Sequence, residues 1–219
     1  MHSDFEPQGQ RKIKKQSINH RSQMIQNIIL AGVGGQGILS IATVVGYMAV
    51  KQGLFLKQSE VHGMSQRGGE VQSHLRISDK KIASDLVPKG KADIIISVEP
   101  MESLRYVSWL KPDGWIISNN KPFINIPNYP DVELIYQKIE SQPRNIHFDA
   151  EDIAKSLGAE KSANMVILGA ASPFLEFKVE QYYDAMQYIF GKKGEGVLKI
   201  NKDAFNAGRE IALKKINKL

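Results

Sequence analysis

The apolar positions of this chain form short continuous runs that alternate with longer periodic stretches, which is typical of strands followed by helices. Residues 27–31 form the first run and predict a buried strand. Residues 38–49 then carry apolar side chains at helical spacing, which predicts a helix from about residue 35 that ends at Gly53. Leu54 to Leu56 predicts a second strand. This order favours an α/β fold.

Three later runs extend the same order. Residues 71–77 alternate between apolar and polar, so we expect a half-buried strand that is antiparallel to its neighbour. Residues 94–98 are almost continuously apolar, which predicts a central strand covered on both faces. A helix over residues 100–110 and a turn at residues 112–114 are then expected before another strand at residues 115–118.

The last third of the chain is predicted to be mainly helical. Four prolines mark residues 120–144 as an irregular connection with at most one short element, around residues 132–139. An edge strand at residues 146–148 is expected to precede a helix that Asp149 caps and that runs through Leu157. Three helices follow, at residues 163–171, 179–190 and 202–218, and they cover one face of the sheet or bind a partner subunit. The expected fold is a Rossmann-like, doubly wound, mostly parallel sheet with one antiparallel strand and C-terminal covering helices.

Composition narrows the chemistry. The chain has 219 residues, of which 42% are hydrophobic and 24% charged, which suffices for one domain with its own core. It has no cysteine, which excludes disulfides, thiolate zinc sites, cysteine-ligated iron–sulfur clusters and a cysteine nucleophile. Any redox centre must therefore belong to another chain. Because no apolar run approaches the roughly 20 residues of a membrane span and no signal-peptide core is apparent, we expect a cytoplasmic protein without a membrane partner.

The net charge of +6 is unevenly distributed. Residues 1–23 carry half of it, with five lysines and arginines against two acidic residues. They lack a periodic apolar face, so we expect a basic, flexible extension outside a domain at residues 24–219, and Met24 is an alternative start. The body has no basic stripe, so no nucleic-acid partner is expected.

A glycine-rich segment, Gly32-Val-Gly-Gly-Gln-Gly37, connects the first strand to the first helix and matches the dinucleotide fingerprint G-x-G-x-x-G. A strand-to-helix turn of this kind presents backbone N–H groups at the positive end of a helix dipole. It is therefore a candidate anion or phosphate loop, formed by Gly32, Gly34, Gly35, Gln36 and Gly37. In the alternative interpretation, the glycines only allow close helix–sheet packing.

A second segment, Glu60-Val-His-Gly-Met-Ser-Gln-Arg-Gly-Gly69, is expected to form a polar functional loop. Its candidate site residues are Glu60, His62, Ser65, Gln66, Arg67, Gly68 and Gly69. Glu60 lies 23 residues after Gly37, close to the spacing of a ribose-binding acid, but it begins a glycine-rich loop instead of ending a strand. The alternative is a tight connection in which Arg67 is a solvated charge. No histidine pairs with a second ligand at metal spacing, so no metal site is expected.

Together these two segments resemble the gamma-type domain of 2-oxoacid:ferredoxin oxidoreductases. Within that group, the residues of the second segment are most similar to those of the beta subunit of indolepyruvate ferredoxin oxidoreductases. The resemblance covers residues 25 to 215, and only the basic N-terminal extension departs from the pattern.

The resemblance implies a subunit that takes part in oxidative decarboxylation: an arylpyruvate, coenzyme A and oxidised ferredoxin give an arylacetyl-CoA, carbon dioxide and reduced ferredoxin. It also implies that thiamine diphosphate with magnesium and the iron–sulfur clusters reside on a large alpha subunit. On this interpretation no cofactor is tightly bound here, and the chain alone is inactive, with a homodimer as the alternative assembly in isolation. Which group the glycine loop contacts is left open between coenzyme A, the diphosphate and protein.

Two functions of other classes are alternatives. The chain could be a stand-alone NAD(P)- or FAD-binding Rossmann protein, which would bind the dinucleotide by itself. It could also be a non-catalytic module that binds a nucleotide or an acyl-CoA. Formation of a stoichiometric complex with a large thiamine-binding chain separates both from the subunit interpretation.

Overall fold

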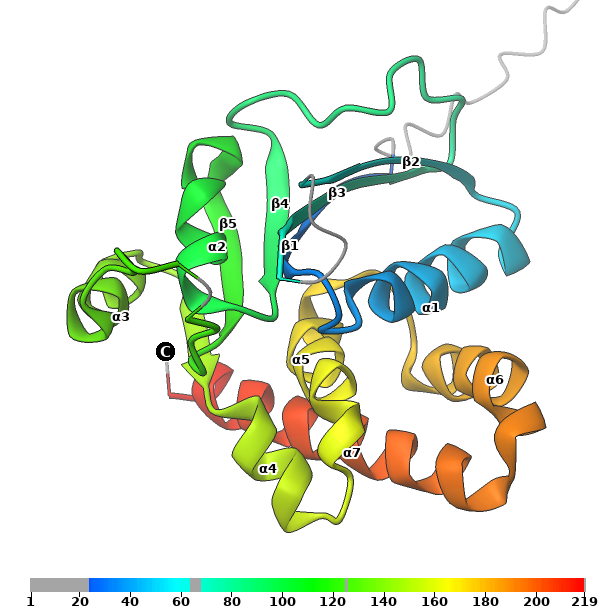
Figure 1. Ribbon diagram of the computed structural model, residues 1–219. Helices are drawn as coiled ribbons and strands as arrows, with labels where there is room; N and C mark the ends of the chain where they lie inside the picture. The colour runs from blue at the N-terminus through cyan, green and yellow to red at the C-terminus, as the bar shows by residue number, and fades with distance from the viewer. Residues whose placement is uncertain (1–23, 64–67, 125, 219) are drawn as a thin grey trace, which may run out of the picture.

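A computed structural model describes residues 24–63, 68–124 and 126–218, in which a six-stranded sheet is flanked by helices (Figure 1). The strands are β1 (Ile25–Val33), β2 (Phe55–His62), β3 (Glu70–Ser78), β4 (Ala92–Ser97), β5 (Leu110–Asn119) and β6 (Asn145–Phe148). The α-helices are α1 (Ile38–Lys51), α2 (Pro100–Arg105), α3 (Val132–Glu140), α4 (Ala150–Ser156), α5 (Ala163–Ala171), α6 (Val179–Phe190) and α7 (Glu195–Ile216).

The strand order is β2-β3-β1-β4-β5-β6. β1, β4, β5 and β6 run parallel, while β3 is antiparallel to both β1 and β2. The predicted Rossmann-like α/β class, the antiparallel strand at residues 71–77 and the central strand at residues 94–98 are confirmed. β6 forms one edge of the sheet, as its sequence predicted.

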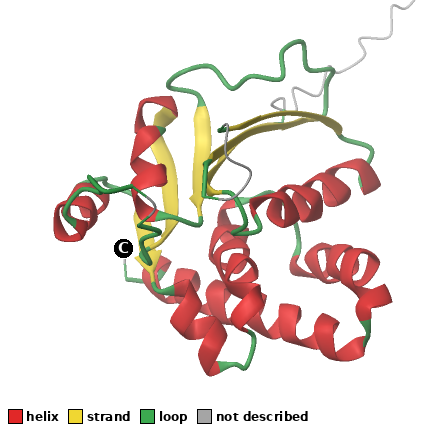
Figure 2. Cartoon of the chain, in the orientation of Figure 1, coloured by secondary structure: helices red, strands yellow, loops and turns green. Residues whose placement is uncertain are grey.

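Helices cover both faces of the sheet, so each central strand has two buried sides (Figures 1 and 2). Ile28 and Leu30 of β1 belong to the larger core, which includes residues of α1 and of α4 to α7. Ile29 and Ala31 face the opposite side and belong to a smaller core with Tyr106. Alternate residues of one strand thus enter different cores, which explains why this strand is written as an unbroken apolar run.

The packing of α5 against α7 explains two glycines. All residues from Met165 to Ala171 are buried, because α5 lies between the sheet and α7. A Cβ on Gly169 would overlap the carbonyl oxygen of Phe205, and a Cβ on Gly208 would overlap that of Val166. The two backbones therefore contact each other directly at this crossing.

Five expected boundaries are wrong, three of them in helices. α1 begins at Ile38 instead of residue 35, because Gly34 to Gly37 form the turn before it. The helix expected at residues 100–110 ends at Arg105 and is followed by a short 3-10 turn, and α7 begins at Glu195, seven residues before the expected start at 202.

The other two corrections concern strands. β2 continues to His62, because its backbone pairs with β3 along its whole length. The turn expected at residues 112–114 is an irregularity inside β5, where the pairing with β4 steps from Leu110 to Trp115. The short element expected near residues 132–139 is α3, and Asp149 caps α4 as predicted.

Residues 1–23, the predicted basic extension, lie outside the described residues. In the described ranges, no helix is both long enough and apolar enough to cross a membrane.

Candidate functional site

A cavity of about 650 Å³ lies at the carboxyl ends of the central parallel strands. It is bordered by the glycine loop after β1, by Val98 after β4 and by Asn119 at the end of β5. α1 follows β1 on one face of the sheet and α2 follows β4 on the other, so the chain changes sides here. Such a crevice is where open α/β sheets bind ligands.

The glycine loop has the conformation that its sequence predicted. Gly35 and Gly37 have positive φ angles of 101° and 81°, which favour glycine. A Cβ on Gly35 would meet nothing within 4 Å, so this residue borders open space. Gln36 lies beside the cavity, while its side-chain oxygen accepts a 2.9 Å hydrogen bond from the N–H of Val33 and closes the turn.

Two N–H groups of this loop are available to a ligand. Within the described part of the chain, the N–H groups of Gly35 and Gly37 donate no hydrogen bond. Gly37 stands at the N-terminus of α1, a helix of 14 residues. Free N–H groups at a helix start attract an anion.

The structure brings the C-terminal end of the second sequence segment against this loop. The N–H of Gly34 donates to the carbonyl of Gly69 at 2.8 Å, and the N–H of Gly68 donates to the carbonyl of Gly34 at 3.3 Å. Ser65, Gln66 and Arg67 lie outside the described residues. The two motifs, which are separated by a helix and a strand in sequence, therefore meet at one edge of the sheet.

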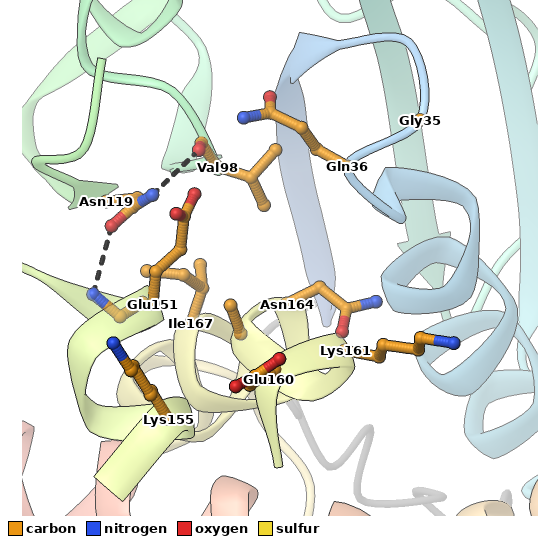
Figure 3. Close-up of a pocket in the computed structure, with 12 residues that line it drawn as sticks. Gly35, Gln36, Val98, Asn119, Glu151, Lys155, Glu160, Lys161, Asn164 and Ile167 are labelled. Carbon is orange, nitrogen blue, oxygen red and sulfur yellow. Dashed lines mark hydrogen bonds between the residues drawn. The ribbon is translucent and has the colours of Figure 1, made fainter. Parts of the chain in front are cut away.

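The remaining polar groups of the cavity come from later elements (Figure 3). The Asn119 side chain donates to the carbonyl of Val98 at 3.2 Å and accepts from the N–H of Ala150 at 3.0 Å, so it joins β4, β5 and α4. Glu151 and Lys155 of α4 also line the cavity, and in Figure 3 the Glu151 carboxylate points into it. Lys155 forms no ion pair within the described residues, and its ammonium is therefore available to an anion.

A group of buried acids lies at the same edge, after β4. Glu99 is fully buried and caps α2 by accepting a 2.8 Å hydrogen bond from the N–H of Glu102, and the hydroxyl of Tyr129 also donates to it. Glu102 accepts a 3.0 Å hydrogen bond from Arg105, yet one of its oxygens has no hydrogen-bond partner. Burial raises the pKa of Glu102 to about 7, and Arg105 opposes that rise only in part. Glu99 also accepts a 3.3 Å hydrogen bond from the N–H of Phe123 and so holds the loop after β5 in place, and neither acid lines the cavity.

Glu60 and His62 correct the predicted extent of the second loop. Both lie in the edge strand β2 instead of a loop, where they form an ion pair with each other, and neither lines the cavity. The reason is the backbone pairing of Glu60 with Ser73 and of His62 with Val71, which continues the strand.

The position of Glu60 also separates this site from a standard dinucleotide site. In that arrangement the acid that binds ribose ends the strand beside the glycine-loop strand. Here β3 lies between β1 and β2, so Glu60 is two strands away from the glycine loop.

Sequence reasoning missed Asn119, Lys155, Lys161 and Asn164, all of which border the cavity. Three of them lie in segments where no local motif marks them. Asn119 alone carried a signal, because it is a polar residue at the carboxyl end of a predicted parallel strand. Among the described residues, no group of three or more His, Asp or Glu side chains is placed to hold a metal ion.

The chain is similar in sequence to one protein family and to subunits of known enzymes. The family model described as pyruvate ferredoxin/flavodoxin oxidoreductase matches residues 27–211. The indolepyruvate oxidoreductase subunit IorB of Pyrococcus horikoshii is 35% identical over 201 residues, which cover 87% of this chain and 98% of that protein.

Two solved structures share the fold. The gamma subunit of a keto/oxoacid ferredoxin oxidoreductase from Geobacter sulfurreducens aligns with a TM-score of 0.62 and 24% identity over 86% of this chain and 99% of its own. The 2-oxoglutarate:ferredoxin oxidoreductase of Magnetococcus marinus, solved with 2-oxoglutarate, coenzyme A and succinyl-CoA bound, aligns with a TM-score of 0.69 and 23% identity. That alignment covers 87% of this chain but only 31% of the longer chain.

Proposed function

Because this chain belongs to the pyruvate ferredoxin/flavodoxin oxidoreductase family, we propose that it is the small subunit of a 2-oxoacid:ferredoxin oxidoreductase that acts on indolepyruvate or a related arylpyruvate. The observation that carries the proposal is its 35% identity to an indolepyruvate oxidoreductase subunit over nearly the whole of that subunit. The glycine loop and the Gly68–Gly69 end of the second motif meet at one edge of the sheet, which supports a single functional surface there.

The proposed reaction converts an arylpyruvate, coenzyme A and two oxidised ferredoxins into an arylacetyl-CoA, carbon dioxide, two reduced ferredoxins and one proton. Thiamine diphosphate with magnesium, on the large subunit, supplies the carbanion chemistry, and iron–sulfur clusters there carry the electrons. The absence of cysteine from this sequence supports that division, since thiolates are the usual cluster ligands.

The role that we propose for this chain is to bind coenzyme A at the edge that faces the large subunit. Two features of the cavity suit a phosphate group: Gly35, whose N–H is free within the described chain, lines it, and Lys155 and Lys161 line it too, although Glu151 and Glu160 oppose their charge. Phe123 and Ile124, which are 41% and 68% exposed, lie on the loop after β5 at this edge. A large subunit docked here would bury them and exclude water from the reaction.

Replacing Lys155 tests this role in the assembled enzyme. We expect Lys155→Met to raise KM for coenzyme A about 10-fold, equivalent to about 1.4 kcal/mol, with kcat nearly unchanged. Lys192→Met is the matched control, because Lys192 is exposed and does not border this cavity. An unchanged KM for coenzyme A in Lys155→Met would show that Lys155 is a solvated surface charge that does not bind coenzyme A.

The interpretation of Arg67 as a residue that faces the active site stays a prediction from sequence. Its permanent charge and forked donors suit a carboxylate or a phosphate. We expect Arg67→Ala to lower turnover of the assembled enzyme about 10-fold without preventing assembly, as measured by steady-state kinetics and gel filtration.

The substrate preference is tested by comparing kcat/KM for indolepyruvate, phenylpyruvate, pyruvate and 2-oxoglutarate. The proposal requires that one of the two aromatic substrates has the highest kcat/KM.

A further inference from the structure

A second cavity of about 530 Å³ lies on the other side of the N-terminus of α5. It is lined by Ser40 of α1, by Ser162 of the short turn η2 (Glu160–Ser162), and by residues at the end of α6 and the start of α7. Glu160, Lys161 and Asn164 border both cavities, which are therefore neighbours. Nothing in the proposed reaction uses this second space.

Its polar end is formed by a hydroxyl without a partner. Ser162 is only 5% exposed and occupies the N-cap position of α5, yet its side chain makes no capping hydrogen bond. Elsewhere in the described ranges its hydroxyl has no other hydrogen-bond partner. The first N–H groups of α5, a helix of nine residues, also lack side-chain acceptors from this cap. The Ser162 oxygen is not among the fully buried unpartnered atoms of the described ranges, so this hydroxyl reaches the cavity, where it can donate to an oxygen acceptor.

The charge around the cavity is positive. Lys161 and Lys193 border it and form no ion pair with any described residue, while Glu160 is the one acidic residue among its lining side chains. The ammonium of Lys193 lies 5.7 Å from the centre of the Phe190 ring, so it stands between the polar and the apolar parts of the wall.

The opposite wall is apolar. Phe190 is 8% exposed, and Val197 and Ile200 of α7 are 38% and 36% exposed, so part of this apolar wall is open to solvent. The cavity lies within the size range of small-molecule sites, in which apolar walls are combined with a few polar groups. A ligand with one negative end and one apolar body would satisfy both walls.

We propose that this second cavity binds a small carboxylate with an apolar body, with the carboxylate at Ser162 and Lys193 and the apolar body against Phe190, Val197 and Ile200, and phenylacetate is the probe chosen for it. This inference does not depend on the proposed function, because it concerns binding to the chain by itself. Since Lys161 also borders the first cavity, a bound acid would draw this lysine away from an anion there.

Calorimetric titration of the full chain with sodium phenylacetate tests the inference, with phenylacetamide as a neutral ligand of the same shape. We expect one saturable site for phenylacetate and at least about 10-fold weaker binding of the amide, because the amide lacks the charge that the lysines attract. Lys193→Met and Val197→Trp should each weaken phenylacetate binding about 5-fold or more. Lys199→Met is the control on α7, because Lys199 pairs with Asp203 outside this cavity.

Three results would overturn the inference. They are no saturation up to about 10 mM phenylacetate, equal binding of the amide, or loss of binding in Lys155→Met that matches the loss in Lys193→Met. The last result would place the acid in the first cavity, since Lys155 borders only that one of the two. Circular dichroism checks that each variant is folded. If Val197→Trp is unfolded, the test rests on the Lys193→Met variant alone, because Lys193 is exposed and its replacement leaves the core unchanged.

Discussion

Glu102 shows how one buried carboxyl couples the stability of this fold to pH. It is 3% exposed, and burial raises its pKa from 4.5 to about 7. The folded chain therefore holds the Glu102 proton more tightly than the unfolded chain does. The stabilisation is complete below about pH 4.5 and is lost as the pH rises through about 7.

We predict that Glu102→Gln removes this loss. The free energy of unfolding of the variant, relative to the wild type, should rise by about 2 kcal/mol between pH 5 and pH 8.5, because the amide stays neutral. Urea unfolding at both pH values measures the change. Glu210→Gln, an exposed change on α7, controls for the loss of one carboxylate. A relative stability that is the same at both pH values would show that Glu102 is ionised without penalty in the folded chain.

The residues of the site were only partly predictable from sequence. Gly35 and Gly37 were found because a positive φ in a strand-to-helix turn demands glycine, which leaves a local signature. Lys155 and Asn164 were not found, because an exposed lysine and a helical asparagine look ordinary until the fold brings α4 and α5 to the same cavity. The sequence therefore predicts site residues that a local backbone conformation requires, but it does not predict residues that only the fold brings to the same cavity.

At the scale of elements, the strands that were misjudged are those without a continuous apolar pattern. β2 is an edge strand whose residues 57–60 are all polar, so its extent is set by hydrogen bonds to β3 and not by burial. In β5, Pro112-Asp113-Gly114 has the composition of a turn, yet the chain continues along β4 after an irregular step. In both strands, hydrogen bonding to the neighbouring strand determines the extent of the strand, although the local composition favours a loop or a turn.

The crossing of α5 and α7 yields a prediction at this scale. Gly208→Ala should lower the free energy of unfolding by about 2 to 4 kcal/mol, because the added Cβ would overlap the carbonyl of Val166 and separate the helices. Gly196→Ala is the matched control in the same helix, because a Cβ there meets nothing within 4 Å. Thermal unfolding followed by circular dichroism measures both variants. Equal stability of the two would mean that the backbones of α5 and α7 are not in direct contact.

At the scale of the whole molecule, the doubly wound architecture follows from the distribution of apolar residues. Continuous runs in β1 and β4 required cover on both faces, and the long helical C-terminal third provides most of the cover on one of them. This much was predictable, since layer order depends on patterns that extend over many residues. The same organisation places Gly34 against Gly68 and Gly69 at the carboxyl end of β1, beside the first cavity.

The central claim is that this chain is one subunit of a 2-oxoacid:ferredoxin oxidoreductase and carries no redox centre of its own. It is tested most directly by measuring ferredoxin reduction that depends on indolepyruvate and coenzyme A, with this chain alone, a thiamine-binding large subunit alone, and the two co-purified. We expect a stable complex, with full activity in the complex and none in this chain alone. Activity of this chain by itself, or failure of the two chains to form a complex under conditions in which both are folded, would contradict the account.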